Sequence, residues 1–198
     1  MNTVLSVFTV FILAVLNVVN SVKVSIYYEA LCPDSKSFIA RQLHPNYKEI
    51  ANYVDLDLIP YGKAIHNKNN GKWEFSCQHG PPECRGNKYQ SCILSLKNGA
   101  ENDVQCARRF GLNIQKIRTC ASSDIGEELL ALNGDKTWKL EPTISFVPTI
   151  VYDDKFDQLS QDLSLMDFIA VVCRKLNETK PTICNNRPLP KRSFWAIF

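Results

Sequence analysis

The sequence has little excess charge of either sign. Its 23 lysine and arginine residues nearly balance 20 aspartate and glutamate residues, which gives a net charge of +3. A protein that binds nucleic acid through its phosphates usually presents a pronounced basic surface. Most of the small positive excess comes from the last dozen residues. The composition therefore argues against a nucleic-acid partner.

Long apolar runs are also scarce. One run, Val4–Leu16, lies in an opening stretch of 21 residues without a charged side chain. It is too short to span a bilayer comfortably but suits the apolar part of a secretory signal. We therefore predict that residues 1–21 are a signal peptide cleaved near Ser21, with an uncleaved anchor as the alternative. No later run is long enough to span, so the mature chain is predicted to be soluble.

All eight cysteines follow this opening stretch. Cysteine-rich chains that pass through an oxidising compartment usually form disulfides. The sequence also contains a glycosylation sequon at Asn177, which fits the same route. Together these features predict a secreted glycoprotein, with the lysosome or endosome as the alternative location.

The first part of the mature chain has the pattern of a β-α-β unit. Val22–Tyr28 alternates like a strand, and Pro33 suits the first turn of a helix. That helix is predicted to run to Leu43 and to end at His44-Pro45. Tyr53–Gly62 then alternates apolar and acidic residues. A strand-helix-strand order predicts that the two strands are parallel.

The pattern changes between residues 63 and 140, which we interpret as a helical insertion held by disulfides. Lys63–Lys72 is polar and rich in turn residues, so a loop is predicted there. Three helical patterns follow. The last of them has Asp124 and Glu127 at capping-box spacing and is expected to stop at Asn133-Gly134.

A sheet resumes after the insertion. Ile144–Asp154 is rich in β-forming residues on both sides of Pro148, a candidate cis-proline whose alternative is a trans edge-strand proline. Leu163–Leu176 is an amphipathic helix predicted to point Leu165 and Phe168 inward. One domain, residues 22–184, is therefore predicted, followed by a flexible tail over residues 185–198.

The order of elements points to redox chemistry of the thioredoxin type. Cys32 begins the first helix, where backbone N–H groups and the positive helix end stabilise a thiolate. Val147-Pro148-Thr149 precedes the predicted hairpin, and a cis-proline there would expose backbone for an extended substrate. Cys32 is therefore the candidate nucleophile.

A second segment carries a specific resemblance. "CQHGPPECRGNKYQSC" fits the pattern C-Q-H-G-x2-E-C-x2-N-x4-C in every fixed position: Cys77, Gln78, His79, Gly80, Glu83, Cys84, Asn87 and Cys92. This pattern resembles the signature of the gamma-interferon-inducible lysosomal thiol reductase (GILT) family. "YYEALC" and "IPYGKA" are also similar to family sequence. The resemblance implies a mixed α/β, thioredoxin-like fold with a helical insertion, and reduction of protein disulfides without a cofactor.

Two features depart from that family. Family enzymes carry Cys-x-x-Cys where this chain has Cys32-Pro33-Asp34-Ser35, so Ser35 stands in place of the resolving cysteine. The stretch after Cys92 is also short, which leaves an odd number of cysteines beside Cys32. The odd thiol either stays unpaired or bonds to Cys32.

Three functions remain open at this point. The first is a protein-binding role on a scaffold whose dithiol cycle has been lost, with the tail and the Lys63–Lys72 loop as candidate contact surfaces. The second is a monothiol reductase or isomerase that uses Cys32 and an external thiol. A metal site at Cys77, His79, Cys84 and Cys92 is the least favoured, because their spacing lacks a zinc knuckle. His79 is interpreted as a structural residue, and His44 and His66 as surface residues.

Disulfides are expected in the insertion and near the C-terminus, where apolar periodicity is weak. We predict Cys106–Cys120 and Cys173–Cys184, and one further bond within the set Cys77, Cys84 and Cys92.

Overall fold

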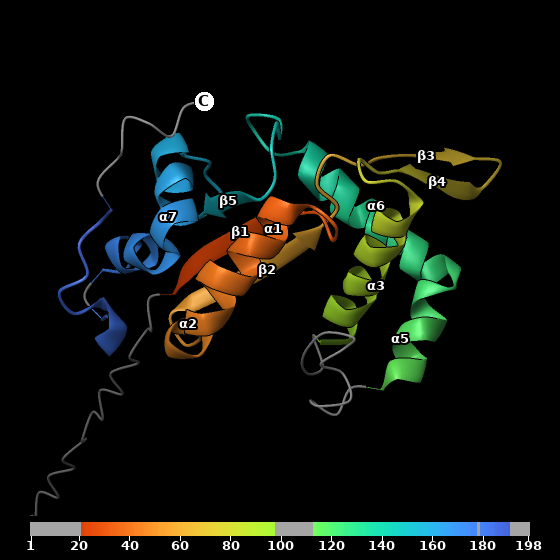
Figure 1. Cartoon of the computed structure of the whole chain (residues 1–198). Helices are drawn as coiled ribbons and strands as arrows, with labels where there is room; N and C mark the ends of the chain where they lie inside the picture. Colours follow the sequence, from red (N-terminus) through yellow and green to blue (C-terminus); the bar gives the residue numbers. More distant parts are fainter. Residues whose placement is uncertain (1–20, 98–112, 178, 191–198) are drawn as a thin grey trace, which may run out of the picture.

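The computed structural model describes residues 21–97, 113–177 and 179–190 (Figure 1). Most of the predicted signal peptide, Cys106 and the last eight residues of the tail lie outside these ranges. None of the helices in the described ranges combines the length and the apolar character needed to cross a membrane.

A three-stranded sheet forms the centre of the molecule. Its order is β2 (Val54–Pro60), β1 (Val22–Tyr28) and β5 (Thr149–Tyr152). β1 runs parallel to β2, as the β-α-β pattern predicts, and antiparallel to β5. β1 is central and mostly buried, which explains its run of valine, isoleucine and tyrosine. The mixed α/β, thioredoxin-like fold predicted from the sequence is confirmed.

The helix after β1 is longer than predicted. α1 (Pro33–Phe38) continues through a π-helical turn, Ile39–Leu43, into α2 (His44–Ile50). The predicted stop at His44-Pro45 is therefore wrong. A wider turn directly before a proline lets the chain pass the missing N–H and the ring without ending the helix.

The second sheet segment and the last helix also differ in detail from prediction. β5 begins only after Pro148, and the turn at Asp153 leads to a single bridge instead of a full strand. α7 (Gln158–Lys175) has non-helical dihedral angles at Asp167. This kink changes the phase of the helix, so Phe168 is buried as predicted whereas Leu165 is 44% exposed.

The segment between β2 and β5 lies at one end of the sheet, and α7 lies at the opposite end (Figure 1). Its elements are, in order, β3 (Ile65–Asn69), β4 (Lys72–Ser76), α3 (Pro81–Lys97), α5 (Ile114–Ala121) and α6 (Asp124–Trp138). The loop predicted over Lys63–Lys72 is in fact most of a hairpin. Asn70 and Gly71 both have positive φ in its turn, a pairing typical of two-residue hairpin connections.

His66 and Gly134 are buried against each other, which overturns two predictions. The His66 side chain is 3% exposed and stacks on Trp138 with ring centroids 4.2 Å apart. A Cβ at Gly134 would lie 2.6 Å from both His66 and Tyr61. α6 therefore continues through Gly134, because the glycine serves close packing of the hairpin and does not end the helix. His44, in contrast, is exposed as predicted.

Three disulfides occur in the described residues: Cys77–Cys84, Cys92–Cys120 and Cys173–Cys184. The Cys173–Cys184 bond, which ties α7 to the short helical turn Thr182–Cys184, is as predicted. The Cys77–Cys84 bond is the one predicted within the set Cys77, Cys84 and Cys92. The predicted Cys106–Cys120 bond is wrong, because α3 and α5 pack side by side and bring Cys92 to Cys120.

Candidate functional site

Cys32 is the free cysteine among those that the structure describes. It caps α1, with Pro33 in the first helical position as the sequence predicts. Its thiol donates to the carbonyl oxygen of Val147 over 3.8 Å. The Val147–Pro148 peptide bond is cis, so the candidate cis-proline has that form and lies beside the candidate nucleophile. Cys32 is only 6% exposed. A reacting partner must therefore enter the groove beside Cys32 to reach its sulfur.

Ser35 lies one turn into α1 and is fully buried. Its hydroxyl oxygen accepts a hydrogen bond from the backbone N–H of Glu29 at 3.4 Å. Ser35 thus supports the chain immediately before Cys32. It supplies no sulfur to receive the Cys32 sulfur in a disulfide.

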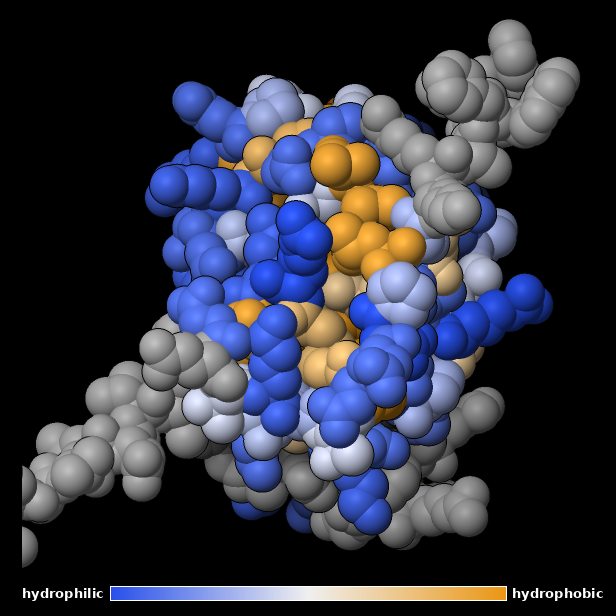
Figure 2. Space-filling view, turned by 90° about the vertical axis from the view of Figure 1, so that its left-hand side faces the viewer, coloured by the Kyte–Doolittle hydropathy of each residue, from blue (hydrophilic) through white to orange (hydrophobic). Residues whose placement is uncertain are grey.

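A groove of about 530 Å³ runs beside this site. Its walls come from α1 and the turn after it, from the segment around Val147–Pro148, and from Leu165 of α7. Asp34 and Arg41 give it charges of both signs, and Phe38 and Phe146 give it apolar surface. Seen from the side of α7, the molecule shows a strip of apolar residues bordered by hydrophilic ones (Figure 2). α7 exposes Leu159 and Met166 in addition to Leu165.

The signature motif folds into a disulfide-closed turn and the start of α3. Cys77 and Cys84 close the turn, and Gly80 adopts a φ of +76° within it. The turn directs His79 back onto the helix. The backbone N–H of His79 donates to Glu83 Oε1 at 3.1 Å, and His79 Nδ1 lies 2.6 Å from Glu83 Oε2.

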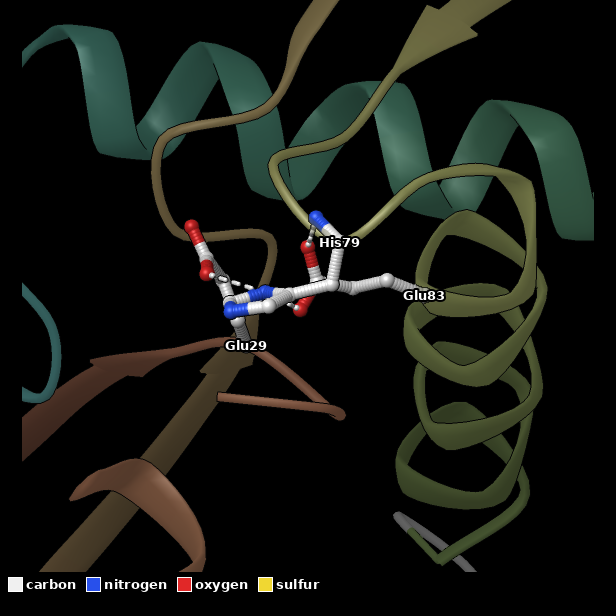
Figure 3. Close-up of side chains that lie close together, drawn as sticks. All are labelled: Glu29, His79 and Glu83. Carbon is white, nitrogen blue, oxygen red and sulfur yellow. Dashed lines mark hydrogen bonds and ion pairs between the residues drawn. The ribbon is translucent and has the colours of Figure 1, made fainter. Parts of the chain in front are cut away.

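Glu29, at the end of β1, completes this cluster (Figure 3). His79 Nδ1 lies 3.5 Å from Glu29 Oε2, and both glutamates are fully buried while the histidine is partly exposed. Burial raises the pKa of Glu29, and the Glu83 carboxylate acts in the same direction. The backbone N–H of Lys63, which donates to Glu29 Oε1 at 2.9 Å, opposes that rise. The surroundings of Glu29 therefore disfavour the charged form of its carboxyl group.

The remaining polar positions of the motif extend this network. With its amide oriented to suit its neighbours, Gln78 donates to Glu29 Oε1 at 3.1 Å and accepts from Lys63 Nζ at 3.2 Å. Asn87 is buried and accepts from the N–H of Ala30 at 2.8 Å. Cys92 lies further along α3 and bonds to α5. The motif thus surrounds the segment that leads into Cys32.

The donor set does not favour a metal ion. Oxygen and nitrogen atoms of Glu29, His79 and Glu83 lie within 4.8 Å of one another. Each of these side chains is already hydrogen-bonded, and the Lys63 ammonium next to Gln78 adds a positive charge nearby. Cys77, Cys84 and Cys92 cannot serve as thiolate ligands because their sulfurs form disulfides. The structure thus contradicts the metal set considered from the sequence.

The sequence predicts most residues of this site, but it does not predict Glu29. The structure brings Cys32, Ser35 and Pro148 to one side of the first helix and gathers the motif behind the preceding loop. Glu29 carried a signal, since an acidic residue at the end of an otherwise apolar, buried strand needs a partner. Its partners lie more than 30 residues away in the chain, so the pattern alone did not name them.

Comparison with known proteins is consistent with this geometry. A family profile described as "Gamma interferon inducible lysosomal thiol reductase (GILT)" matches residues 23–124. GILT-like protein 1 of Drosophila melanogaster is 31% identical, over 83% of this chain and 78% of its own length. A GILT-like protein of Anopheles gambiae is 32% identical, over 85% and 82% respectively. The gamma-interferon-inducible lysosomal thiol reductase of Mus musculus is 30% identical, over 83% and 72%.

Among solved structures, a variant of Pseudomonas aeruginosa DsbA is similar, with a TM-score of 0.51. The match covers 79% of this chain and 86% of that protein, at 12% sequence identity. At so low an identity the similarity establishes the fold alone. The motif, the family profile and the relatives agree on the closer relationship. This chain belongs to the gamma-interferon-inducible lysosomal thiol reductase family.

Proposed function

We propose that this protein binds disulfide-containing polypeptides in the groove beside Cys32 and does not run a dithiol reductase cycle. The observation that supports this most is the pairing of a free Cys32 with a buried Ser35. The thiol lies beside the Val147 carbonyl and the cis Pro148, next to a groove that is open to an extended chain. The apolar surface and mixed charges of that groove suit a polypeptide better than a small molecule.

The chemistry available to Cys32 is one half of thiol-disulfide exchange. The Cys32 thiolate attacks a substrate sulfur, a Cys32–substrate S–S bond forms, and the substrate S–S bond breaks. The second substrate sulfur leaves as a thiolate and takes up a proton. In a Cys-x-x-Cys enzyme the second cysteine would then attack Cys32 and release the substrate. Ser35 has no sulfur to form that bond, so the covalent complex persists.

A second function is favoured by the fact that Cys32 is free. A small external thiol can attack the mixed disulfide and release the substrate as a thiol, and a second molecule of it regenerates Cys32. The small thiol ends as its own disulfide, so electrons balance. In that case the protein is a monothiol reductase or isomerase. The limited exposure of Cys32 argues for slow turnover by this route.

The same proposal covers location. Secretion, with the lysosome or endosome as the alternative, is supported by the three disulfides and by the family relationship. Asn177, the residue of the sequon, is exposed just after α7, as glycosylation requires. Residues 1–21 remain a proposed signal peptide. The tail predicted over residues 185–198 is held to the domain in its described part, because Arg187 pairs with Asp167 at 2.8 Å and Leu189 packs against the core of the sheet.

Reduction of insulin disulfides, measured at acidic and neutral pH, tests the proposal. In a single-turnover assay with pre-reduced protein, we expect the natural sequence to release no reduced insulin unless a small thiol is present, whereas Ser35→Cys should release a stoichiometric amount as its two cysteines become a disulfide. A matched Ser35→Ala variant, which has no second sulfur either, is expected to stay inactive. Release of reduced insulin by the pre-reduced natural sequence without a small thiol would show that a dithiol step, or an equivalent of it, exists.

A further inference from the structure

The backbone that leads into Cys32 is held in an unusual way. Between the end of β1 and Cys32, three consecutive N–H groups donate to side chains instead of to backbone carbonyls. The acceptor atoms are Ser35 Oγ for Glu29 at 3.4 Å, Asn87 Oδ1 for Ala30 at 2.8 Å, and Glu83 Oε2 for Leu31 at 3.3 Å.

All three acceptor side chains are fully buried. Their other bonds fix them in turn. Glu83 is held by His79, and the Asn87 amide donates to the carbonyl oxygen of Tyr61 at 3.4 Å. α3 also approaches the loop closely, because a Cβ at Gly86 would lie 2.8 Å from the Cβ of Ala30. The disulfide-closed turn therefore aims two acceptors on α3 at the loop.

We infer that Ser35, Glu83 and Asn87 are positioning residues that hold Cys32 against the Val147 carbonyl. We refer to these three side chains as the acceptor clamp. This inference rests on the proposed role of Cys32 and deepens it, since it assigns a task to the signature motif and to the serine. Ala30 and Leu31 are half-buried, but their acceptors are fully buried. An N–H group that loses such an acceptor is left without a good partner in the closed loop, so each member of the clamp stabilises the closed form.

The consequence is control of access to the thiol. Cys32 is nearly buried in the closed loop, and a reagent reaches it when the loop opens. Removing one acceptor destabilises the closed loop relative to open forms in which water satisfies the N–H group. By the usual cost of an unsatisfied buried donor, we expect opening to become at least about fivefold more frequent. The thiol should then react faster, although it loses its set position beside Val147.

The test is the rate at which iodoacetamide alkylates Cys32 in the folded protein, followed by mass mapping. Asn87→Ala removes the acceptor of Ala30 and should raise that rate at least about fivefold. Asn87→Asp retains an acceptor oxygen for Ala30 but loses the amide donation to the Tyr61 carbonyl, so its rate should rise less than that of Asn87→Ala. The matched control is Asn133→Ala, which removes a 3.0 Å bond to Ser91 on α3 but does not touch the loop.

An unchanged alkylation rate in Asn87→Ala overturns the inference, as does an equal increase in Asn133→Ala. If Asn87→Ala does not fold, hydrogen exchange of the natural sequence decides. The amides of Ala30 and Leu31 should then be protected to a degree comparable with β1, and exchange at the rate of an open loop would overturn the inference. None of these readouts depends on substrate capture, so failure of the proposed function and failure of the clamp are separable.

Discussion

The sheet and the insertion of this protein are stabilised by different means. The sheet, its first helix and α7 share one large apolar cluster, in which Val24, Ile26, Ile150, Phe168 and Ile169 are completely buried. Over its described residues, 63–97 and 113–140, the insertion has small apolar clusters of a few buried residues each. It adds two disulfides and the polar contacts of the acceptor clamp. The comparison indicates that apolar burial holds the sheet, whereas covalent bonds and buried polar contacts hold the insertion.

The largest effect is expected from a deletion in the apolar cluster of the sheet. Phe168 is 0% exposed and contacts Phe38 edge-to-face at 5.5 Å. Phe168→Ala should lower the free energy of unfolding by about 3–5 kcal/mol, measured by denaturant titration. Leu159→Ala, at a 49% exposed position of the same helix, should change it by less than about 0.5 kcal/mol. Similar losses in both variants would contradict apolar burial as the main support of the sheet.

The next largest effect should come from the disulfide between α3 and α5. Replacing Cys92 and Cys120 together by serine opens a loop with a sequence separation of 28 residues. The chain-entropy treatment gives a loss of about 3–4 kcal/mol. We expect the loss to fall mainly on the insertion, so that hydrogen exchange rises in α5 more than in β1. An equal rise in both regions would show that the two are not supported separately.

A smaller effect is expected where the hairpin packs on α6. Gly134→Ala places a methyl group 2.6 Å from the rings of His66 and Tyr61. Overpacking of this kind should cost about 1–3 kcal/mol, measured as a shift in the denaturation midpoint. Leu132→Ala, on the exposed side of α6, serves as the control. A Gly134→Ala variant as stable as the natural sequence would mean that the hairpin is free to move away.

The smallest effects concern pH, and they have opposite signs in the two regions. Burial raises the pKa of Glu29 above its ordinary 4.5. Its stabilising contribution is therefore complete below about pH 4.5 and is lost as the pH rises through the raised pKa. Glu29→Gln should remove the fall in unfolding free energy between about pH 4.5 and neutrality. Thermal unfolding across this pH range measures the change in stability. An identical pH profile in the variant would show that Glu29 is not the titrating group.

His66 should respond in the other direction. Burial lowers its pKa below the ordinary 6.5, although Asp135 partly opposes this. The neutral imidazole then contributes stability that is complete above about pH 6.5 and is lost as the pH falls through the lowered pKa. His66→Phe should flatten the stability profile below about pH 6.5. A profile that stays as steep as in the natural sequence would place the titrating group elsewhere.

The sequence predicts the elements whose pattern is local. The alternation of Val22–Tyr28, Pro33 at a helix start and the spacing around Cys77 led to the correct fold and to the correct position of Cys32. One error arose where a distant contact decides the local structure. Gly134 has the sequence pattern of a helix stop, but it makes room for His66, which precedes it by more than 60 residues.

The acceptor clamp could not be predicted for the same reason. Asn87 and Ala30 are 57 residues apart in the chain, and nothing in either local pattern indicates the other. The motif identified Asn87 as important through resemblance, but not what the side chain does. Pairing of Cys120 with Cys92 likewise depends on how α3 and α5 pack, which cysteine spacing leaves open.

The most direct test of the proposed function is the fate of the covalent complex at Cys32. The protein is mixed with a peptide that contains a single disulfide, without any small thiol, and its intact mass is followed over time. We predict one peptide adduct that maps to Cys32, persists, and disappears when glutathione is added, whereas Cys32→Ser forms none. Release of fully reduced peptide by the natural sequence in the absence of a small thiol would contradict the account.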